Sequence, residues 1–480
     1  MRINPAPTLL ACLLALWAAS PPAVSAQQLI PFTWNEDARW LRAEFAEQHA
    51  NAFHARTRAE YDAAFDRLTE WIPRLDPTGD HAVVVAFART VNAVGDGHSG
   101  IRLFADTAIA FRALPVRLGA YPGGLFVEAA APEHADLVGA RVRALGNVPA
   151  AAALGMVAPL IARDNDMDVL RFGPALLVMP EVLHALGAVS NPEAVDVELE
   201  SDGERWTVRL SPGPIPFLLE GHSLLDVRGA RAGWPDALGM NAPEGSPVSL
   251  LFRDPEADFW AEWLDEERAM YAQVNRIGDS PEQTFEEFSE RLVARADSLG
   301  AERLLLDLRW NRGGDNYLIR PLVRSIVQSR FDEEGRLFVL IGRYTFSAAQ
   351  SLVNELSRLS SPVYVGEPTA AAPNGYGDNR KLVLPNSHIT VRASYLWWQQ
   401  RDPRDERRCT APHVHAPMTF EDYLQGADPG LEAALAWAGE GDAGDGGTGA
   451  DDPALDAEDP AAAYQALLCR DGPPRLGRMF

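Results

Sequence analysis

The chain has 480 residues, too many for one compact core, and its length predicts two to four domains. Its composition, with 47% hydrophobic and 23% charged residues, is that of a globular protein with a large core. The net charge of −24 argues against nucleic acid or an anionic membrane surface as a partner, because phosphates would be repelled. Part of the acidic excess lies in residues 438–480, so it belongs partly to a tail rather than to a binding face.

The N-terminus has the pattern of an export signal. Arg2 is followed by an apolar stretch over residues 9–19, and small residues end at Ala26, where we place the cleavage. Two prolines at positions 21–22 interrupt the stretch before it is long enough to span a bilayer. We therefore expect residues 1–26 to be a signal peptide and the mature protein to be periplasmic or extracellular, without stable membrane insertion.

The next segments change from helical to β-rich character. Residues 27–105 carry apolar positions at helical intervals, including a helix over 81–94, and form an expected helical N-terminal domain. Residues 106–212 alternate short apolar runs with turn residues, which predicts a small β-rich module. Residues 213–250 are rich in proline and glycine and read as a connector.

Residues 251–437 alternate apolar strands with helices, the pattern of an α/β core. We expect strands at 271–276, 304–308, 337–341 and 363–365, and helices at 281–299, 318–328 and 347–359 between them. A hairpin is expected after them, at 381–384 and 389–393. Residues 438–480 form an acidic tail that we expect to be largely disordered.

Three cysteines occur, and Cys12 lies within the expected signal peptide. Cys409 and Cys469 remain in the mature chain and either form one disulfide or stay as two free thiols. Two cysteines without matching histidine spacing do not make a zinc site, and the sequence implies no metal and no organic cofactor.

One strand-to-loop junction carries a paired glycine. The expected strand at 304–308 runs into Gly313 and Gly314, and a helix follows. Glycine lets the backbone approach a ligand closely, so that its N–H can point at a developing oxyanion. A plain strand-to-helix turn explains the same pattern.

A second junction places Ser347 after a strand and at the start of a helix. The small residue Ala348 follows it and leaves space around the hydroxyl, and a helix N-terminus stabilises developing negative charge. Ser347 and Gln350 also fit a helix capping box, which is the structural alternative to a nucleophile.

In combination the motifs resemble one family. The D-L-R-x-N-x-G-G strand end at 307–314, the F-S-A-A helix start at 346–349 and the G-E-x-T loop at 366–369 resemble the tail-specific, C-terminal-processing serine proteases. That family also holds the tricorn protease core and the interphotoreceptor retinoid-binding protein. The D-G-H-S segment at 96–99 is similar to the D-x-H-[ST] element of the tricorn-like branch.

The resemblance implies a crotonase-like α/β core with a helical N-terminal domain, and it suggests that the β-rich module is a degenerate PDZ-like domain. It also implies that Ser347 is the nucleophile, with an oxyanion hole made from the backbone N–H of Gly313 or Gly314 and that of Ala348.

A serine needs a base to become nucleophilic. Many relatives use a lysine at the position that Ala372 occupies here, and Lys381, the only lysine of the chain, lies in an expected strand beyond that position. The tricorn-like branch instead uses the histidine that corresponds to His98, whose imidazole titrates near neutral pH as a general base requires.

A third group should orient the histidine. By the same resemblance Asp405 and Glu406 are the candidates, with Ser99 as a partner between acid and histidine. A solvent-exposed run of charges is the alternative for both acidic residues.

These expectations define an exported serine-type peptidase that hydrolyses a peptide or protein substrate through an acyl-enzyme. The retinoid-binding relatives supply the alternative of a catalytically inactive ligand- or peptide-binding protein on the same fold. The sequence leaves homo-oligomerisation and the substrate open.

Overall fold

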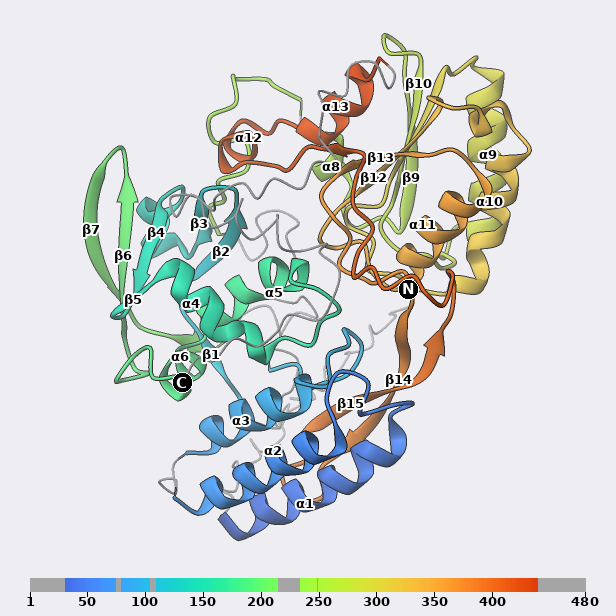
Figure 1. The fold of residues 1–480 in the computed structure, drawn as a ribbon. Coiled ribbons are helices and arrows are strands. Elements are labelled where there is room, and N and C mark those ends of the chain that lie inside the picture. The colour runs from blue at the N-terminus through green and yellow to red at the C-terminus, as the bar shows by residue number, and fades with distance from the viewer. Residues whose placement is uncertain (1–30, 75–78, 104–108, 215–233, 248, 439–480) are drawn as a thin grey trace, which may run out of the picture.

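The computed structural model describes residues 31–74, 79–103, 109–214, 234–247 and 249–438. The expected signal peptide and nearly all of the expected acidic tail lie outside these ranges. The described chain is a mixed α/β structure with several sheets (Figure 1). No helix in these ranges is long and apolar enough to cross a membrane.

Three helices form one end of the molecule, α1 (Pro31–Gln48), α2 (Arg58–Trp71) and α3 (Asp80–Asn92) (Figure 1). Helix α2 begins at a capping box, in which Thr57 accepts from the backbone of Glu60 and the Glu60 side chain accepts from the backbone of Thr57. Its buried side chains recur at helical spacing and pack inward: Tyr61, Phe65 and Leu68.

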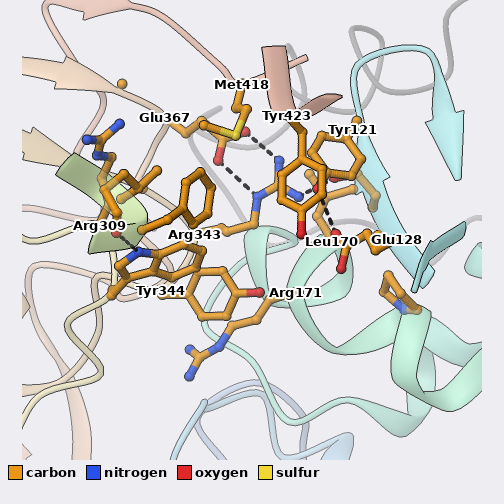
Figure 2. Close-up of a pocket in the computed structure, with 18 of the residues that line it drawn as sticks. Tyr121, Glu128, Leu170, Arg171, Arg309, Arg343, Tyr344, Glu367, Met418 and Tyr423 are labelled. Atoms are coloured by element: carbon orange, nitrogen blue, oxygen red, sulfur yellow. Dashed lines mark hydrogen bonds and ion pairs between the residues drawn. The ribbon is translucent and has the colours of Figure 1, made fainter. Parts of the chain in front are cut away.

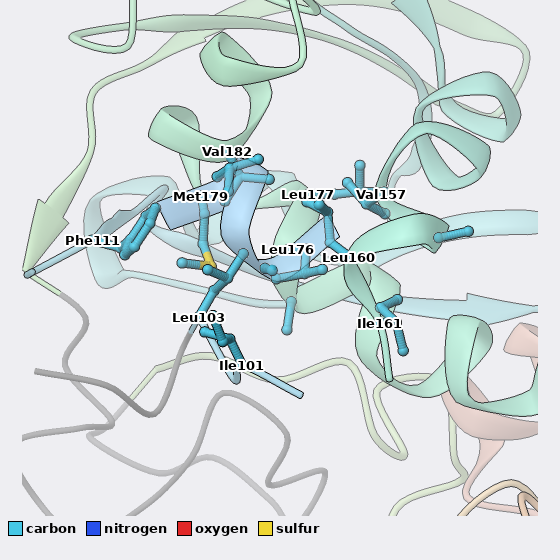
Figure 3. Close-up of a cluster of buried hydrophobic side chains, with 14 of the residues drawn as sticks. Ile101, Leu103, Phe111, Val157, Leu160, Ile161, Leu176, Leu177, Met179 and Val182 are labelled. Carbon is cyan, nitrogen blue, oxygen red and sulfur yellow. The ribbon is translucent and has the colours of Figure 1, made fainter. Parts of the chain in front are cut away.

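A six-stranded antiparallel sheet follows, in which the short strand β5 (Val148–Pro149) pairs with β4 beside the main strand order. Its main strands, in the order β2-β3-β4-β6-β7, are β2 (Val116–Tyr121), β3 (Gly124–Ala130), β4 (Arg141–Leu145), β6 (Val195–Ser201) and β7 (Glu204–Leu210). The remaining elements are β1 (Arg112–Ala113), β8 (Gly213–Pro214), α4 (Ala150–Val157), α5 (Met167–Leu177) and α6 (Pro180–Ala185). Figure 3 shows Leu176 and Val182 in the same buried cluster as Ile101 and Leu103, which follow the D-G-H-S segment.

The α/β core is a six-stranded sheet of order β16-β13-β12-β11-β10-β9. Its strands are β9 (Phe259–Leu264), β10 (Ala269–Val274), β11 (Arg303–Asp307), β12 (Leu337–Ile341), β13 (Val363–Gly366) and β16 (Val414–His415), all parallel except β9 against β10. Every residue of β12 is buried, as expected for a parallel strand covered on both faces.

Helices cover both faces of this sheet. One face packs against α9 (Phe285–Ser298), α10 (Arg320–Val327) and α11 (Ala348–Leu359), and the other against α8 (Leu250–Arg253) and α13 (Pro429–Ala436). Helix α12 (Phe420–Gln425) precedes α13, and short 3-10 helices are η1 (Ile72–Arg74), η2 (Pro132–Leu137), η3 (Ala158–Leu160), η5 (Asn316–Ile319) and η6 (Arg330–Asp332).

A two-stranded hairpin leaves the core and reaches the N-terminal helices (Figure 1). Its strands β14 (Gly375–Val383) and β15 (Thr390–Trp398) are each longer than the sequence predicts. The missed parts carry exposed residues, including Tyr395 and Trp397, so no regular burial pattern marks them. The buried residues Leu382 and Val391 join the same hydrophobic cluster as α1 to α3, so the hairpin ties the core to that end of the molecule.

Candidate active site

Ser347 lies in the turn between β12 and α11. Its backbone has φ 55° and ψ −122°, a conformation that a residue with a side chain rarely adopts and that is typical of functional sites. Its side chain makes no capping hydrogen bond to the helix, and Gln350 bonds elsewhere, so the capping-box alternative is wrong. The turn packs tightly, because a Cβ on Gly313 would lie 2.7 Å from Ser347 Cβ.

His98 lies beside this serine. Its Nε2 is 3.0 Å from Ser347 Oγ, a hydrogen-bond distance. The imidazole stacks on the ring of Phe346, with centroids 4.5 Å apart. Asp96 holds the loop, since its Oδ1 accepts from the backbone N–H of His98 at 3.0 Å and of Ser99 at 2.8 Å. The structure therefore brings together the serine and the histidine that the sequence singled out.

Ser99 contacts the hairpin rather than His98. Its hydroxyl donates to Ser394 Oγ at 3.0 Å and accepts from the Ser394 backbone N–H at 2.9 Å. The adjacent Gly100 pairs with Arg392 through two backbone hydrogen bonds of 2.8 and 2.9 Å. These contacts fix the loop of His98 on strand β15, so Ser99 anchors the loop and does not bridge the histidine to an acid.

A second layer of contacts supports Asp96. The buried His49 donates from Nε2 to Asp96 Oδ2 at 2.9 Å, while its Nδ1 accepts from the backbone of Asn51. Ser394 also donates to Asp96 Oδ1 at 2.8 Å. Although burial acts to raise it, the pKa of Asp96 is lowered overall by these hydrogen bonds and by His49. Asp96 therefore stays ionised while it holds the turn.

Neither acidic residue expected from the sequence reaches His98. Asp405 is paired with Arg407 at 2.7 Å, and the side chain of Glu406 is exposed. The alternative of a solvent-exposed charge run describes them better. The carboxylates whose charges act most on His98 are instead those of Asp164 and Asp96.

Asp164 comes from the β-rich part of the chain, between η3 and α5. It is 7% exposed, and its two oxygens accept from the backbone N–H of Gly97 at 2.8 Å and of Ala372 at 3.1 Å. It thus ties the loop of His98 to the loop of Ala372. No motif marks it, because an isolated Arg-Asp-Asn stretch in a loop carries no sequence signal for a site.

Burial lowers the pKa of His98 below its ordinary value, and the charges of Asp164 and Asp96 act against that shift. The imidazole is therefore neutral near pH 7, as a proton acceptor must be. When Nε2 accepts from Ser347, the proton of the ring resides on Nδ1, which is buried and has no hydrogen-bond partner within the described residues. Burial also raises the pKa of Asp164, whose carboxylate lies in the same buried environment as His98.

Gly313 and Gly314, which follow strand β11, differ in whether their backbone N–H groups are already hydrogen-bonded. The N–H of Gly313 donates to Asn311 Oδ1 at 2.8 Å, so it is occupied. No acceptor within the described chain takes the N–H of Gly314 or of Ala348, and both residues line the same cavity as Ser347. Gly314 also adopts φ 138°, where a Cβ would lie 1.9 Å from the carbonyl oxygen of Ile277.

The cavity in front of Ser347 has a volume of about 250 Å³. Lys381 does not line it and is exposed on β14, so the described structure does not assemble a serine–lysine pair. The described residues contain no cluster of three or more His, Cys, Asp or Glu side chains that could hold a metal. Cys409 is buried and disulfide-bonded, which excludes the free thiol there, and both other cysteines lie outside the described ranges.

A second cavity, of about 120 Å³, separates the β-rich sheet from the core (Figure 2). Strand β2 and helix α5 form one wall. The Arg343–Glu367 ion pair, at 2.5 Å, lies on the other, and Arg343 also donates to the carbonyl of Ala120. Neither Ser347 nor His98 lines this cavity.

No protein-family model and no curated protein matches the sequence. Solved structures do match in fold. Mature CPAF complexed with lactacystin is 12% identical, with 84% of this chain and 97% of that chain covered and a TM-score of 0.54. The CPAF S499A mutant is 14% identical, with 84% and 96% covered and a TM-score of 0.56. The photosystem II D1 C-terminal processing protease also aligns, at 14% identity over 85% and 99%, with a TM-score of 0.35. The chain therefore shares its fold with mature CPAF and with the CPAF S499A mutant.

Proposed function

We propose that this chain is an exported serine-type peptidase, with Ser347 as nucleophile and His98 as general base. The contact of 3.0 Å between His98 Nε2 and Ser347 Oγ carries the proposal. It is supported by the strained backbone of Ser347 and by the lowered pKa of the imidazole. The resemblance of the sequence motifs to the tail-specific serine proteases supports peptide or protein as the substrate class, and the fold is similar to that of mature CPAF.

In the proposed reaction the proton of Ser347 Oγ moves to His98 Nε2 as Oγ bonds to the substrate carbonyl carbon. The N–H groups of Gly314 and Ala348 stabilise the resulting oxyanion, and the start of α11 adds its dipole. The C–N bond then breaks, and His98 gives its proton to the leaving amine. Water attacks the acyl-enzyme with His98 again as base, the acid product leaves, and the proton returns to Ser347.

The charge of Asp164 stabilises the imidazolium that forms in both steps. This role replaces the one that the family resemblance implies for Asp405 or Glu406. We further propose that the strands β9 to β13 with their helices form a crotonase-like core, that the sheet β2 to β7 is a degenerate PDZ-like module, and that residues 1–26 direct export. We also propose the division of the chain into a helical domain at 27–105, a β-rich module at 106–212, a connector at 213–250, a core at 251–437 and an acidic tail at 438–480.

Labelling with a fluorophosphonate tests the proposal, because only an activated serine reacts. The purified chain lacking residues 1–26 should label, the Ser347→Ala variant should not, and the His98→Ala variant should label at least about 100-fold more slowly. Lys381→Ala is the matched control and should label as the parent does. A folded parent protein that does not label across about pH 5–9 would instead favour the inactive binding protein.

A further inference from the structure

No acidic side chain of the described residues holds the imidazole of His98 by a hydrogen bond. Its Nε2 contacts Ser347, and its Nδ1 has no hydrogen-bond partner within the described chain. The two oxygens of Asp164 accept from the backbone of Gly97 and of Ala372, so this carboxylate acts on the ring through its charge. In a Ser-His-Asp triad the acid orients the imidazole by accepting from Nδ1–H, and here another contact must do so.

The ring of Phe346 lies against the imidazole. The two ring centroids are 4.5 Å apart and the ring planes are 29° from parallel, which is a stacked contact. The histidine side chain turns about two torsions, and turning the second swings Nε2 away from Ser347 Oγ and drives the imidazole into a stacked neighbour. Strand β14 limits the ring at another edge, since a Cβ on Gly377 would lie 3.8 Å from His98 Cε1. Packing therefore restricts the plane of the imidazole.

Phe346 is itself held through both its backbone and its ring. Its backbone N–H donates to the carbonyl of Asn311 at 3.1 Å, at the end of the core sheet. Its side chain is 8% exposed and belongs to the same hydrophobic cluster as α1 to α3. The backbone of Gly97 approaches the phenyl ring so closely that a Cβ there would lie 2.8 Å from two ring atoms. One residue thus precedes the nucleophile Ser347 in the chain and touches its base with a fixed ring.

We propose that Phe346 is a positioning residue, whose ring holds the imidazole of His98 in the orientation in which Nε2 faces Ser347 Oγ. The inference rests on the proposed peptidase function and adds to it the group that aligns the base. Since a misplacement of about 1 Å can cost about 100-fold in rate, loss of the ring should slow the step in which His98 takes the proton of the serine. Binding of a small reagent in front of Ser347 does not depend on that alignment.

Fluorophosphonate labelling at several reagent concentrations separates these two quantities. Phe346→Leu keeps an apolar side chain and removes the flat ring, so it should lower the rate constant at saturating reagent at least about tenfold and leave the half-saturating concentration unchanged. Phe111→Leu is the matched control. Phe111 is 6% exposed, belongs to the same cluster and contacts the ring of His81, but it does not line the cavity of Ser347, so this variant should label as the parent does.

Gly97→Ala reaches the ring of Phe346 without altering it. The added Cβ would lie 2.8 Å from the ring and 3.4 Å from Asp164 Oδ1, so this variant should also label more slowly. If it acts through the ring, a smaller leucine at position 346 relieves the contact, and the double variant should label no more slowly than Phe346→Leu alone. Losses that multiply in the double variant would overturn the proposal.

Two further outcomes are decisive. A natively folded Phe346→Leu protein that labels at the rate of the parent overturns the positioning role alone, and so does Gly97→Ala at that rate if Phe346→Leu does not fold. A folded parent protein that does not label refutes the peptidase and the positioning role together.

Discussion

Replacing Asp164 by Asn tests whether the charge of this carboxylate raises the pKa of His98. Its carboxylate is buried and is the largest charge that raises the pKa of His98. Asn has almost the same shape but no charge, so the pKa of His98 should fall further in the variant. The lost charge also destabilises the imidazolium, and each loss of about 1.4 kcal/mol slows a step that forms it about tenfold.

The assay is the rate of fluorophosphonate labelling as a function of pH. Labelling should rise as His98 loses its proton, and in Asp164→Asn the rise should move to lower pH while the plateau falls about tenfold. Asp378→Asn is the matched control, because this carboxylate also acts on His98 but is exposed, so solvent screens its charge. If Asp164→Asn labels with the same pH midpoint and plateau as the parent, the reasoning is refuted. Thermal unfolding of both variants shows whether a slower rate comes from a loss of structure instead of a loss of charge.

Three further changes follow from the geometry. Gly313→Ala places a Cβ 2.7 Å from Ser347 Cβ at φ 111°, so it should displace the serine and slow labelling about 100-fold, measured beside a circular dichroism spectrum that stays native. Asp96→Asn should lower the free energy of unfolding by about 2 kcal/mol in urea at pH 7. The pKa of Asp96 is lower in the folded state than its ordinary value of 3.8, so its carboxylate stabilises the fold fully above that value. This stabilisation is lost as the pH falls through the lower, folded-state pKa, and the difference in unfolding free energy between parent and variant should shrink there. A difference that stays constant with pH would contradict this. Cys409→Ser should lower the unfolding free energy by about 2–4 kcal/mol, and a thiol reductant should then destabilise the parent but not the variant.

The sequence predicts the α/β core well because periodic burial marks it. The strand at 337–341 and the helix that ends at Leu359 coincide with the structure, since short apolar runs flanked by crossover helices are typical of buried parallel strands. The strand β9 was missed, because it lies at the sheet edge with most of its residues only partly buried. The extension of β14 and β15 was missed for the same reason.

The candidate site was predictable where a motif carries it. Ser347 and His98 stand in short patterns that resemble known ones, and the structure places them in contact. Asp164 was not found, because its role arises from contacts between segments distant in sequence. The family resemblance misled the prediction for Asp405, whose partner is its own neighbour Arg407.

The pairing of Ser347 with His98 joins positions 249 residues apart, and it depends on the hairpin β14–β15 that pins the loop of His98. An unfolded or partly folded chain holds the serine and its base too far apart to react, since no local segment contains both. The contact between serine and base therefore requires the folded arrangement in which the hairpin packs against α1 to α3.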